Sequence, residues 1–136
     1  MTTTQASTLM DAQTWSGKIF NGEWITPGDG VYPVIEPATG DQLEVIGRAS
    51  VDDVRHAASH AAEAQKAWAR KSAMERASVI RRAGQLYEQY TAEIMSWIIR
   101  ETGSTPPKAG FELHVAANEC YEAAALATQP YGRLLH

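Results

Sequence analysis

The sequence has one cysteine, Cys120, among its 136 residues. A single cysteine cannot form a disulfide within the chain, and it excludes a metal site built from several thiolates. This cysteine usage fits a reducing compartment, so we expect a cytoplasmic protein. The chain also lacks a run of about 18 apolar residues, so we predict no membrane-spanning helix and no membrane partner.

Positive charge is scarce as well. The chain has 12 lysines and arginines against 16 aspartates and glutamates, a formal net charge of −4. Domains that bind nucleic acid usually present a basic face. The positive residues here are scattered along the chain, so we expect no nucleic-acid partner.

The ten glycines are dispersed, and none of them forms the G-x-G-x-x-G or G-x-x-x-x-G-K pattern that cradles phosphates. No cofactor-binding residue is therefore assigned. The first fourteen residues are rich in Thr, Ser, Gln and Ala and lack the basic start and apolar centre of a secretory signal. We predict a disordered tail over residues 1–16 and an ordered part over 17–136.

Residues 18–48 predict a small antiparallel β-hairpin meander. Asn21-Gly22 is a strong turn dipeptide, and the segment 36–40 combines Pro37 with a closing Gly40. Pro33 cannot donate to a sheet ladder, which makes its strand an edge strand. So few strands are not stable alone.

Three helices are expected after the hairpin unit, over about 51–70, 73–102 and 106–128. Ser50 with Asp53 and Ser72 with Glu75 have the spacing of capping boxes. Gly103 can end the second helix in the left-handed conformation. Thr105 followed by proline suits the start of the third.

The helix expected over 73–102 carries two adjoining apolar stripes. One stripe has seven members and the other has three, which leaves only a narrow polar strip for water. Two stripes require neighbours on two sides, so the piece is expected to lack a layer on which it packs. The first stripe is Ala77, Ile80, Gly84, Tyr87, Thr91, Ile94 and Ile98, and the second is Leu86, Tyr90 and Trp97.

Local chemistry assigns no catalytic residue. Cys120 lies on an apolar, Ala-rich helical face without a basic residue one turn away, which is typical of an inert thiol. His56, His60 and Glu63 share one face of the first helix and offer a divalent-metal site as an alternative, but that face is expected to be solvated. No metal ligands are assigned.

Several short motifs follow one another along the chain: Phe20–Trp24, Glu36–Asp41, Ala49-Ser50 with Asp53-Val54, Ala67–Ala69, Glu75-Arg76 and Arg100–Gly103. Taken in this order, they resemble the N-terminus of the NAD(P)-dependent aldehyde dehydrogenases. Two positions depart from that family's usual pattern, with Glu36 in place of asparagine and Ser104 in place of lysine. Segments 103–109, 122–126 and 129–132 are similar to the aromatic-aldehyde branch, such as benzaldehyde dehydrogenases.

The resemblance implies an α/β fold of which this chain is the leading part: a β-hairpin unit and three helices, without the Rossmann-type sheet. It implies oxidation of an aromatic aldehyde to the carboxylic acid with NAD or NADP through an activated cysteine. The family's catalytic cysteine, glutamate, asparagine and cofactor loop all lie beyond this segment. The isolated chain is therefore expected to be inactive and to bind no cofactor, with homo-oligomers formed only by the full-length protein.

In the family, the third helix borders the substrate entrance. The resemblance therefore makes Ala117 and Tyr121 candidates for lining that channel. The rival from another class is a stand-alone helical module that binds a partner helix. Such a module should bury its apolar faces, whereas a fragment should expose a contiguous apolar patch.

Overall fold

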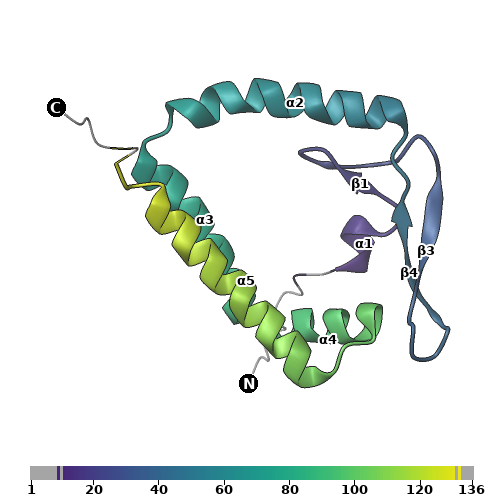
Figure 1. Cartoon of the computed structure of the whole chain (residues 1–136). Helices are drawn as coiled ribbons and strands as arrows, with labels where there is room; N and C mark the ends of the chain where they lie inside the picture. The colour runs from purple at the N-terminus through teal and green to yellow at the C-terminus, as the bar shows by residue number, and fades with distance from the viewer. Residues whose placement is uncertain (1–8, 10, 131, 133–136) are drawn as a thin grey trace, which may run out of the picture.

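The computed structural model describes Leu9, residues 11–130 and Gly132. The elements form an open frame: the hairpins lie along one side, α2 (Val51–Arg70) along another, and the remaining helices close the frame (Figure 1). None of the helices in the described part of the chain has the length and hydropathy needed to cross a membrane.

The four expected strands form, but they pair as two separate two-stranded sheets and not as one meander. β1 (Ile19–Phe20) pairs with β2 (Trp24–Ile25), and β3 (Val31–Ile35) pairs with β4 (Gln42–Gly47), both antiparallel. The segment between β2 and β3 is held elsewhere: the N–H of Gly28 donates to the Asp53 carboxylate at 2.8 Å. The two sheets are nevertheless connected, because the N–H of Gly17 donates to the Val45 carbonyl at 3.0 Å and the N–H of Gly47 donates to the Lys18 carbonyl at 3.2 Å.

The predicted turn after β3 is confirmed. The N–H of Gly40 donates to the Glu36 carbonyl at 2.9 Å, and Gly40 has a φ of 80°. A positive φ is a conformation that glycine adopts without steric cost. The turn also reaches a helix, because the Arg100 guanidinium lies 3.5 Å from the Glu36 carboxylate.

Both predicted capping boxes are present. At the start of α2, the Asp53 N–H donates to the Ser50 hydroxyl at 3.1 Å, and the Ser50 N–H donates to the Asp53 carboxylate at 2.8 Å. Ser72 and Glu75 form the same pair of bonds at the start of α3 (Ala73–Gln89). These bonds satisfy N–H groups that the first helical turn leaves unpaired.

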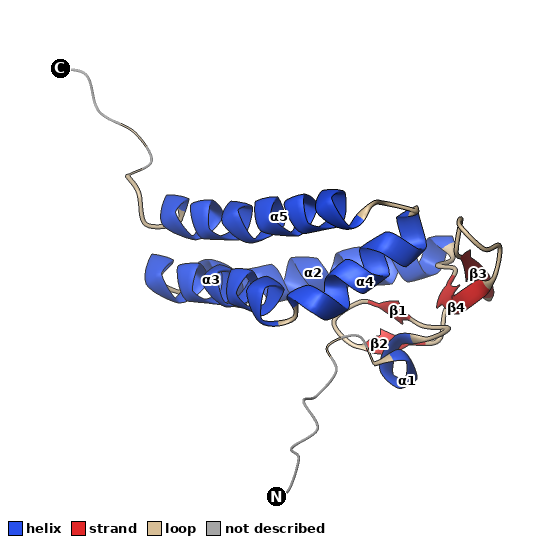
Figure 2. Cartoon of the chain, turned by 90° about the horizontal axis from the view of Figure 1, so that it is seen from below, coloured by secondary structure: helices blue, strands red, loops and turns tan. Residues whose placement is uncertain are grey.

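The single helix expected over 73–102 is wrong, because the chain bends at Tyr90 and continues as α4 (Thr91–Thr102). Tyr90 has φ −106° and ψ 23°, outside the helical range. The Thr91 hydroxyl donates to the Glu88 carbonyl at 2.8 Å and to the Tyr87 carbonyl at 3.1 Å. A hydroxyl that competes for these carbonyls bends a helix. Figures 1 and 2 both show α4 leaving the direction of α3.

The end of this helical segment follows the prediction. Gly103 ends α4 with a φ of 69°, and its N–H donates to the Ile99 carbonyl. α5 (Pro106–Leu126) begins with proline as expected, but Thr105 makes no side-chain capping bond, and the helix ends two residues before position 128. Pro106 at the first helical position, where no N–H is needed, is sufficient for the start.

The disordered tail expected over 1–16 is wrong for its last part. Asp11 caps a short helix, α1 (Ala12–Trp15), by accepting the N–H of Gln13. The Trp15 ring packs edge-on against Trp97 of α4, with ring centroids 5.7 Å apart. The Ser16 hydroxyl donates to Glu44 at 2.7 Å. Residues 1–8 and 10 lie outside the described residues.

The core lies between α3 and α5, which run side by side (Figure 2). Its members are small, and no large side chain in the described range is fully buried. The buried apolar residues are Ala77, Ala109, Leu113, Ala117 and Ala124. On α5, the Ala-rich face noted from the sequence is therefore the side that packs against α3.

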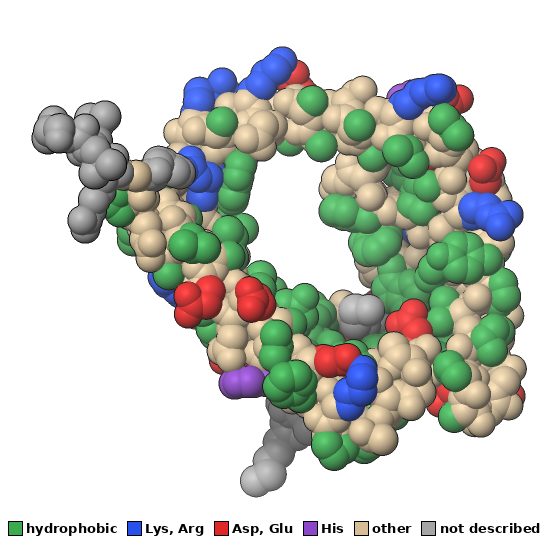
Figure 3. All heavy atoms as spheres, viewed as in Figure 1, with side chains coloured by type: hydrophobic (Ala, Val, Ile, Leu, Met, Phe, Trp, Pro, Cys, Tyr) green, Lys and Arg blue, Asp and Glu red, His purple; other side chains and the backbone are tan. Residues whose placement is uncertain are grey.

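Outside this core, large apolar side chains remain exposed. α2 has no buried residue along its 20-residue length. Phe20 is 61% exposed and Val79 is 54% exposed. The space-filling view shows an opening through the molecule with apolar side chains along its edge (Figure 3). The frame therefore leaves much apolar surface uncovered.

We predict that Gly84→Ala destabilises the α3–α5 pair. A Cβ at this position would lie 2.8 Å from the Tyr121 ring and 3.2 Å from the Ala117 carbonyl oxygen. Overpacking of this kind costs about 1–3 kcal/mol. The matched control is Gly110→Ala in α5, where the Cβ would meet Met95 at an ordinary 3.5 Å. It should gain up to about 1 kcal/mol of helix propensity. The melting temperature of each variant is measured by thermal unfolding. A rise in the melting temperature of both variants would contradict this packing.

A second prediction concerns the stability of the chain at acid pH. Hydrogen bonds from the Gly28 and Ser50 N–H groups hold the pKa of Asp53 below its ordinary value of 3.8. A carboxylate with a depressed pKa contributes stability above its unfolded pKa and loses it as the pH falls through the folded one. The melting midpoint should therefore fall as the pH drops below about 3.8. In the Asp53→Asn variant the melting midpoint should fall less steeply with decreasing pH, because asparagine does not titrate. An equally steep fall in both proteins would show that Asp53 does not cause the pH dependence.

Candidate functional site

The two candidate channel residues lie on the side of α5 that contacts α3. Ala117 is only 4% exposed. Tyr121 is half-buried, and its hydroxyl donates to the Glu88 carboxylate of α3 at 2.8 Å. Its ring covers Gly84, the residue at which α3 has no side chain. The structure therefore brings both candidates to one helix–helix contact.

A cavity of about 220 Å³ opens beside this contact. Ala117 lines this cavity. Tyr121 does not line it, but its hydroxyl bonds to Glu88, which does. The polar groups at its edge are Glu88 and His114, whose Nε2 lies 2.9 Å from the Asn118 amide nitrogen. The full lining is Tyr87, Glu88, Thr91, Gly110, Leu113, His114 and Ala117.

The Tyr121–Glu88 hydrogen bond fixes the protonation of the phenol. Donation to the Glu88 carboxylate raises the pKa of Tyr121 above its ordinary value of 10.0, and partial burial raises it further. Tyr121 is therefore a neutral hydrogen-bond donor at physiological pH and not a base. The contact can orient a helix and line a cavity, but it has no nucleophile.

The other residues considered from the sequence are not assembled into a site. Cys120 is half-buried and free. His56, His60 and Glu63 are exposed on α2, and within the described residues no three His, Cys, Asp or Glu side chains are grouped so that they could hold a metal ion. The exposure of these three residues agrees with the solvated face expected from the sequence, and His60 also borders a groove against the β1–β2 hairpin.

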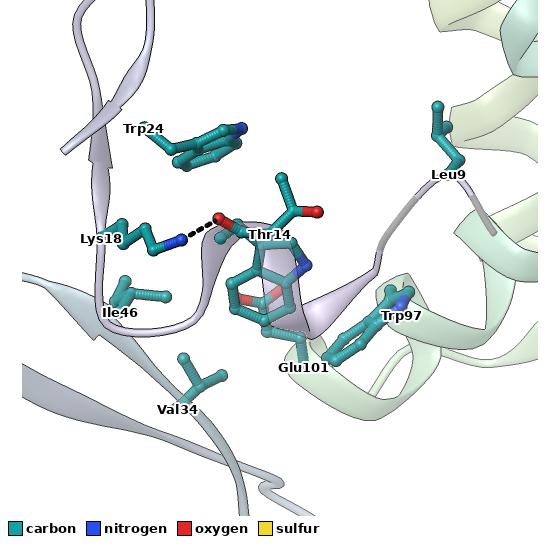
Figure 4. Close-up of a pocket in the computed structure, with 9 residues that line it drawn as sticks. Leu9, Thr14, Lys18, Trp24, Val34, Ile46, Trp97 and Glu101 are labelled. Carbon is teal, nitrogen blue, oxygen red and sulfur yellow. Dashed lines mark hydrogen bonds between the residues drawn. The ribbon is translucent and has the colours of Figure 1, made fainter.

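A second cavity, of about 290 Å³, lies among α1, the hairpins and α4. Figure 4 shows Trp24, Lys18 and Trp97 around it, with Val34 and Ile46 on the hairpin side. The Lys18 ammonium donates to the Thr14 carbonyl at 2.9 Å. Sequence reasoning missed this cavity because no periodic pattern relates its walls, which come from distant segments. Its lining also includes Leu9, Trp15 and Glu101.

Comparison with known proteins decides the family. The model of the aldehyde dehydrogenase family matches residues 24–136, most of the chain. The chain belongs to the aldehyde dehydrogenase family. The resemblance inferred from the short motifs is thereby confirmed.

Two relatives of this chain in the aldehyde dehydrogenase family are named for aromatic aldehydes. A vanillin dehydrogenase of Amycolatopsis sp. is 54% identical over 127 residues, covering 93% of this chain and 26% of the relative. The benzaldehyde dehydrogenase [NAD(+)] of Pseudomonas putida is 37% identical, covering 88% of this chain and 25% of the relative. The chain thus spans about a quarter of the length of the curated relatives it matches.

Solved aldehyde dehydrogenases share the fold. An NAD-dependent benzaldehyde dehydrogenase from Corynebacterium glutamicum superposes with a TM-score of 0.82 at 32% identity, over 93% of this chain and 28% of that protein. A salicylaldehyde dehydrogenase from Pseudomonas putida G7, solved with salicylaldehyde, gives a TM-score of 0.75 at 30% identity, over 82% of this chain and 23% of that protein. The predicted fold class, an N-terminal segment of this family's α/β fold, is confirmed.

Removal of the Tyr121 hydroxyl tests the helix contact. Tyr121→Phe keeps the ring on Gly84 but loses the donor to Glu88, so we expect a small decrease in the melting midpoint at neutral pH. The raised pKa means that the hydrogen bond contributes below the phenol's unfolded pKa and is lost as the pH rises through the folded one. The difference from the unsubstituted chain should therefore shrink at strongly alkaline pH. A constant difference would show that the ring, and not the hydroxyl, is responsible.

Proposed function

We propose that this chain is the N-terminal quarter of an NAD(P)-dependent dehydrogenase that oxidises an aromatic aldehyde to its carboxylic acid. The observation that carries the proposal is the 54% identity to a vanillin dehydrogenase along 93% of the chain. The similarity to a benzaldehyde dehydrogenase and to a salicylaldehyde dehydrogenase supports the same substrate class. We place the protein in the cytoplasm and expect homo-oligomers only in its longer form.

We further propose that residues 17–136 are part of a cofactor-binding domain but do not themselves hold the cofactor. Dinucleotides are bound through a pyrophosphate at a glycine-rich helix N-terminus. The N-termini of α2 and α3 already hold the carboxylates of Asp53 and Glu75. α5 begins with Pro106 and Pro107, which lack N–H groups. These three helix starts do not fit a nicotinamide dinucleotide, so no step of the reaction is assigned to them.

The uncovered surface supports the fragment interpretation over the rival, a stand-alone helical module. A self-sufficient module buries its apolar faces, whereas here α2 has no buried residue. The large side chains of Phe20, Val79 and Phe111 are each more than half exposed. Large contiguous apolar surface on a soluble piece marks a contact with further protein.

A fusion tests the activity. The chain is joined to the Amycolatopsis vanillin dehydrogenase from which the matching N-terminal segment has been removed, and formation of reduced nicotinamide is followed with vanillin and benzaldehyde. We expect activity in the fusion, none in the 136-residue chain, and none in the remainder alone. Oxidation by the chain alone, or a folded fusion without activity, would refute the proposal.

In the same fusion we propose that Ala117 and Tyr121 border the substrate path, a proposal supported by the cavity beside Ala117. Tyr121→Phe should then change the KM for an aromatic aldehyde while kcat changes little, because uniform binding is altered and not the chemical step. An unchanged KM would assign Tyr121 to helix packing alone.

A further inference from the structure

Three of the four tryptophans of this chain line the cavity of about 290 Å³ among α1, the hairpins and α4. Trp15 and Trp97 meet edge to face with ring centroids 5.7 Å apart, and Trp24 lies on the hairpin side (Figure 4). Val34 and Ile46 add apolar side chains to the wall. Walls of this kind accept a planar ring, because aromatic rings pack well against one another at such distances.

The cavity is small and has polar groups in its wall. Its volume lies near the lower end of the range for small-molecule sites, about 300–1,000 Å³, which suits a compound with a single ring. The indole nitrogen of Trp15 is buried and has no hydrogen-bond acceptor among the described residues. A buried donor without an acceptor is costly. A ligand that brings an oxygen to Trp15 would remove that cost, which favours a ring with acceptors over a hydrocarbon.

Two charged side chains of opposite sign line the cavity. The Lys18 ammonium donates to the Thr14 carbonyl at 2.9 Å, and since an ammonium carries three N–H groups, it can also donate to a ligand. The Glu101 carboxylate comes from α4 and is exposed. Figure 4 shows Glu101 without a hydrogen bond to Lys18. The two charges therefore remain open to a ligand that carries a matching group for each.

We propose that this cavity is a binding site for a hydroxylated aromatic carboxylate. The ring lies among the tryptophans, the carboxylate accepts from Lys18, and a ring hydroxyl donates to Glu101. Charge-assisted hydrogen bonds at the two ends fix the orientation, because the reverse orientation would place the carboxylate against Glu101. The proposal concerns binding alone and does not rest on the proposed function, although an aromatic acid is also what the proposed dehydrogenase would release.

A cation held over the indole rings is the rival occupant. Tryptophan faces attract cations, and the Glu101 carboxylate would add to that attraction. The Lys18 ammonium opposes it, because a cationic ligand would lie beside a second positive charge. A cation without acceptors also leaves the buried Trp15 donor unpaired. The anion is therefore the better fit.

The indole resonances of the 136-residue chain test the site directly. The chain is labelled with nitrogen-15, and the tryptophan N–H resonances, assigned by replacing each tryptophan with phenylalanine in turn, are followed during titration with 4-hydroxybenzoate. Trp15, Trp24 and Trp97 should shift along one saturation curve, with a dissociation constant on the order of 1 mM. Trp68 lies on α2 and does not line the cavity, so its resonance should not shift.

Variants without charge separate the two ends of the ligand. Lys18→Gln should weaken binding of 4-hydroxybenzoate at least about tenfold, because a hydrogen bond between charged groups is lost. It should leave binding of 4-hydroxybenzyl alcohol, which has no carboxylate, unchanged. Glu101→Gln should reduce the preference for 4-hydroxybenzoate over benzoate. The matched control is Lys66→Gln, whose ammonium pairs with Glu63 on α2, and it should change neither measurement.

The proposal is overturned if the three cavity resonances do not respond, or if Trp68 shifts equally. Tighter binding of benzyltrimethylammonium than of 4-hydroxybenzoate would make the cavity a cation site instead. A missing nuclear Overhauser contact between the Trp15 and Trp97 rings in the ligand-free chain would also overturn it, because the site is proposed for these 136 residues as they stand. None of these measurements involves dehydrogenase activity, so their failure leaves the proposed function standing.

Discussion

The packing of α5 against α3 is the contact on which the helical part of the structure depends. It is possible because the facing residues are small: α3 has Gly84 where the Tyr121 ring lies, and α5 presents Ala109, Ala117 and Ala124. Small residues bring the helices close, but they bury little apolar area per residue. The contact therefore specifies an arrangement more effectively than it stabilises the chain.

The local geometry of the elements comes from hydrogen bonds near their ends. The carboxylate of Asp53 closes the capping box of α2 and also holds Gly28, so one side chain fixes both the start of a helix and the approach of the preceding loop. Glu36 also connects two elements. It begins the turn that follows β3, and its carboxylate forms an ion pair with Arg100 of α4. These few bonds hold the frame around an opening that no described element fills.

The opening inside the frame can be compared with what is known of the aldehyde dehydrogenase family. The chain matches about a quarter of each relative, yet over that quarter it superposes closely on a complete benzaldehyde dehydrogenase. The apolar side chains along the uncovered edge accord with the proposal that the chain is part of a longer protein. The contribution proposed for these residues is structural support, not chemistry.

The sequence by itself determined the features that depend on neighbouring residues: both capping boxes, the turn at Gly40, the end at Gly103 and the strands and helices between them. These follow from bonds spanning a few residues, which a local pattern records. The bend at Tyr90 was missed although its cause is local, because the apolar spacing continues past the Thr91 hydroxyl that bonds to the Glu88 carbonyl. Only the tertiary structure decided that Trp15 packs on Trp97 and that Tyr121 bonds to Glu88, since contacts between distant segments leave no periodic signal in the sequence.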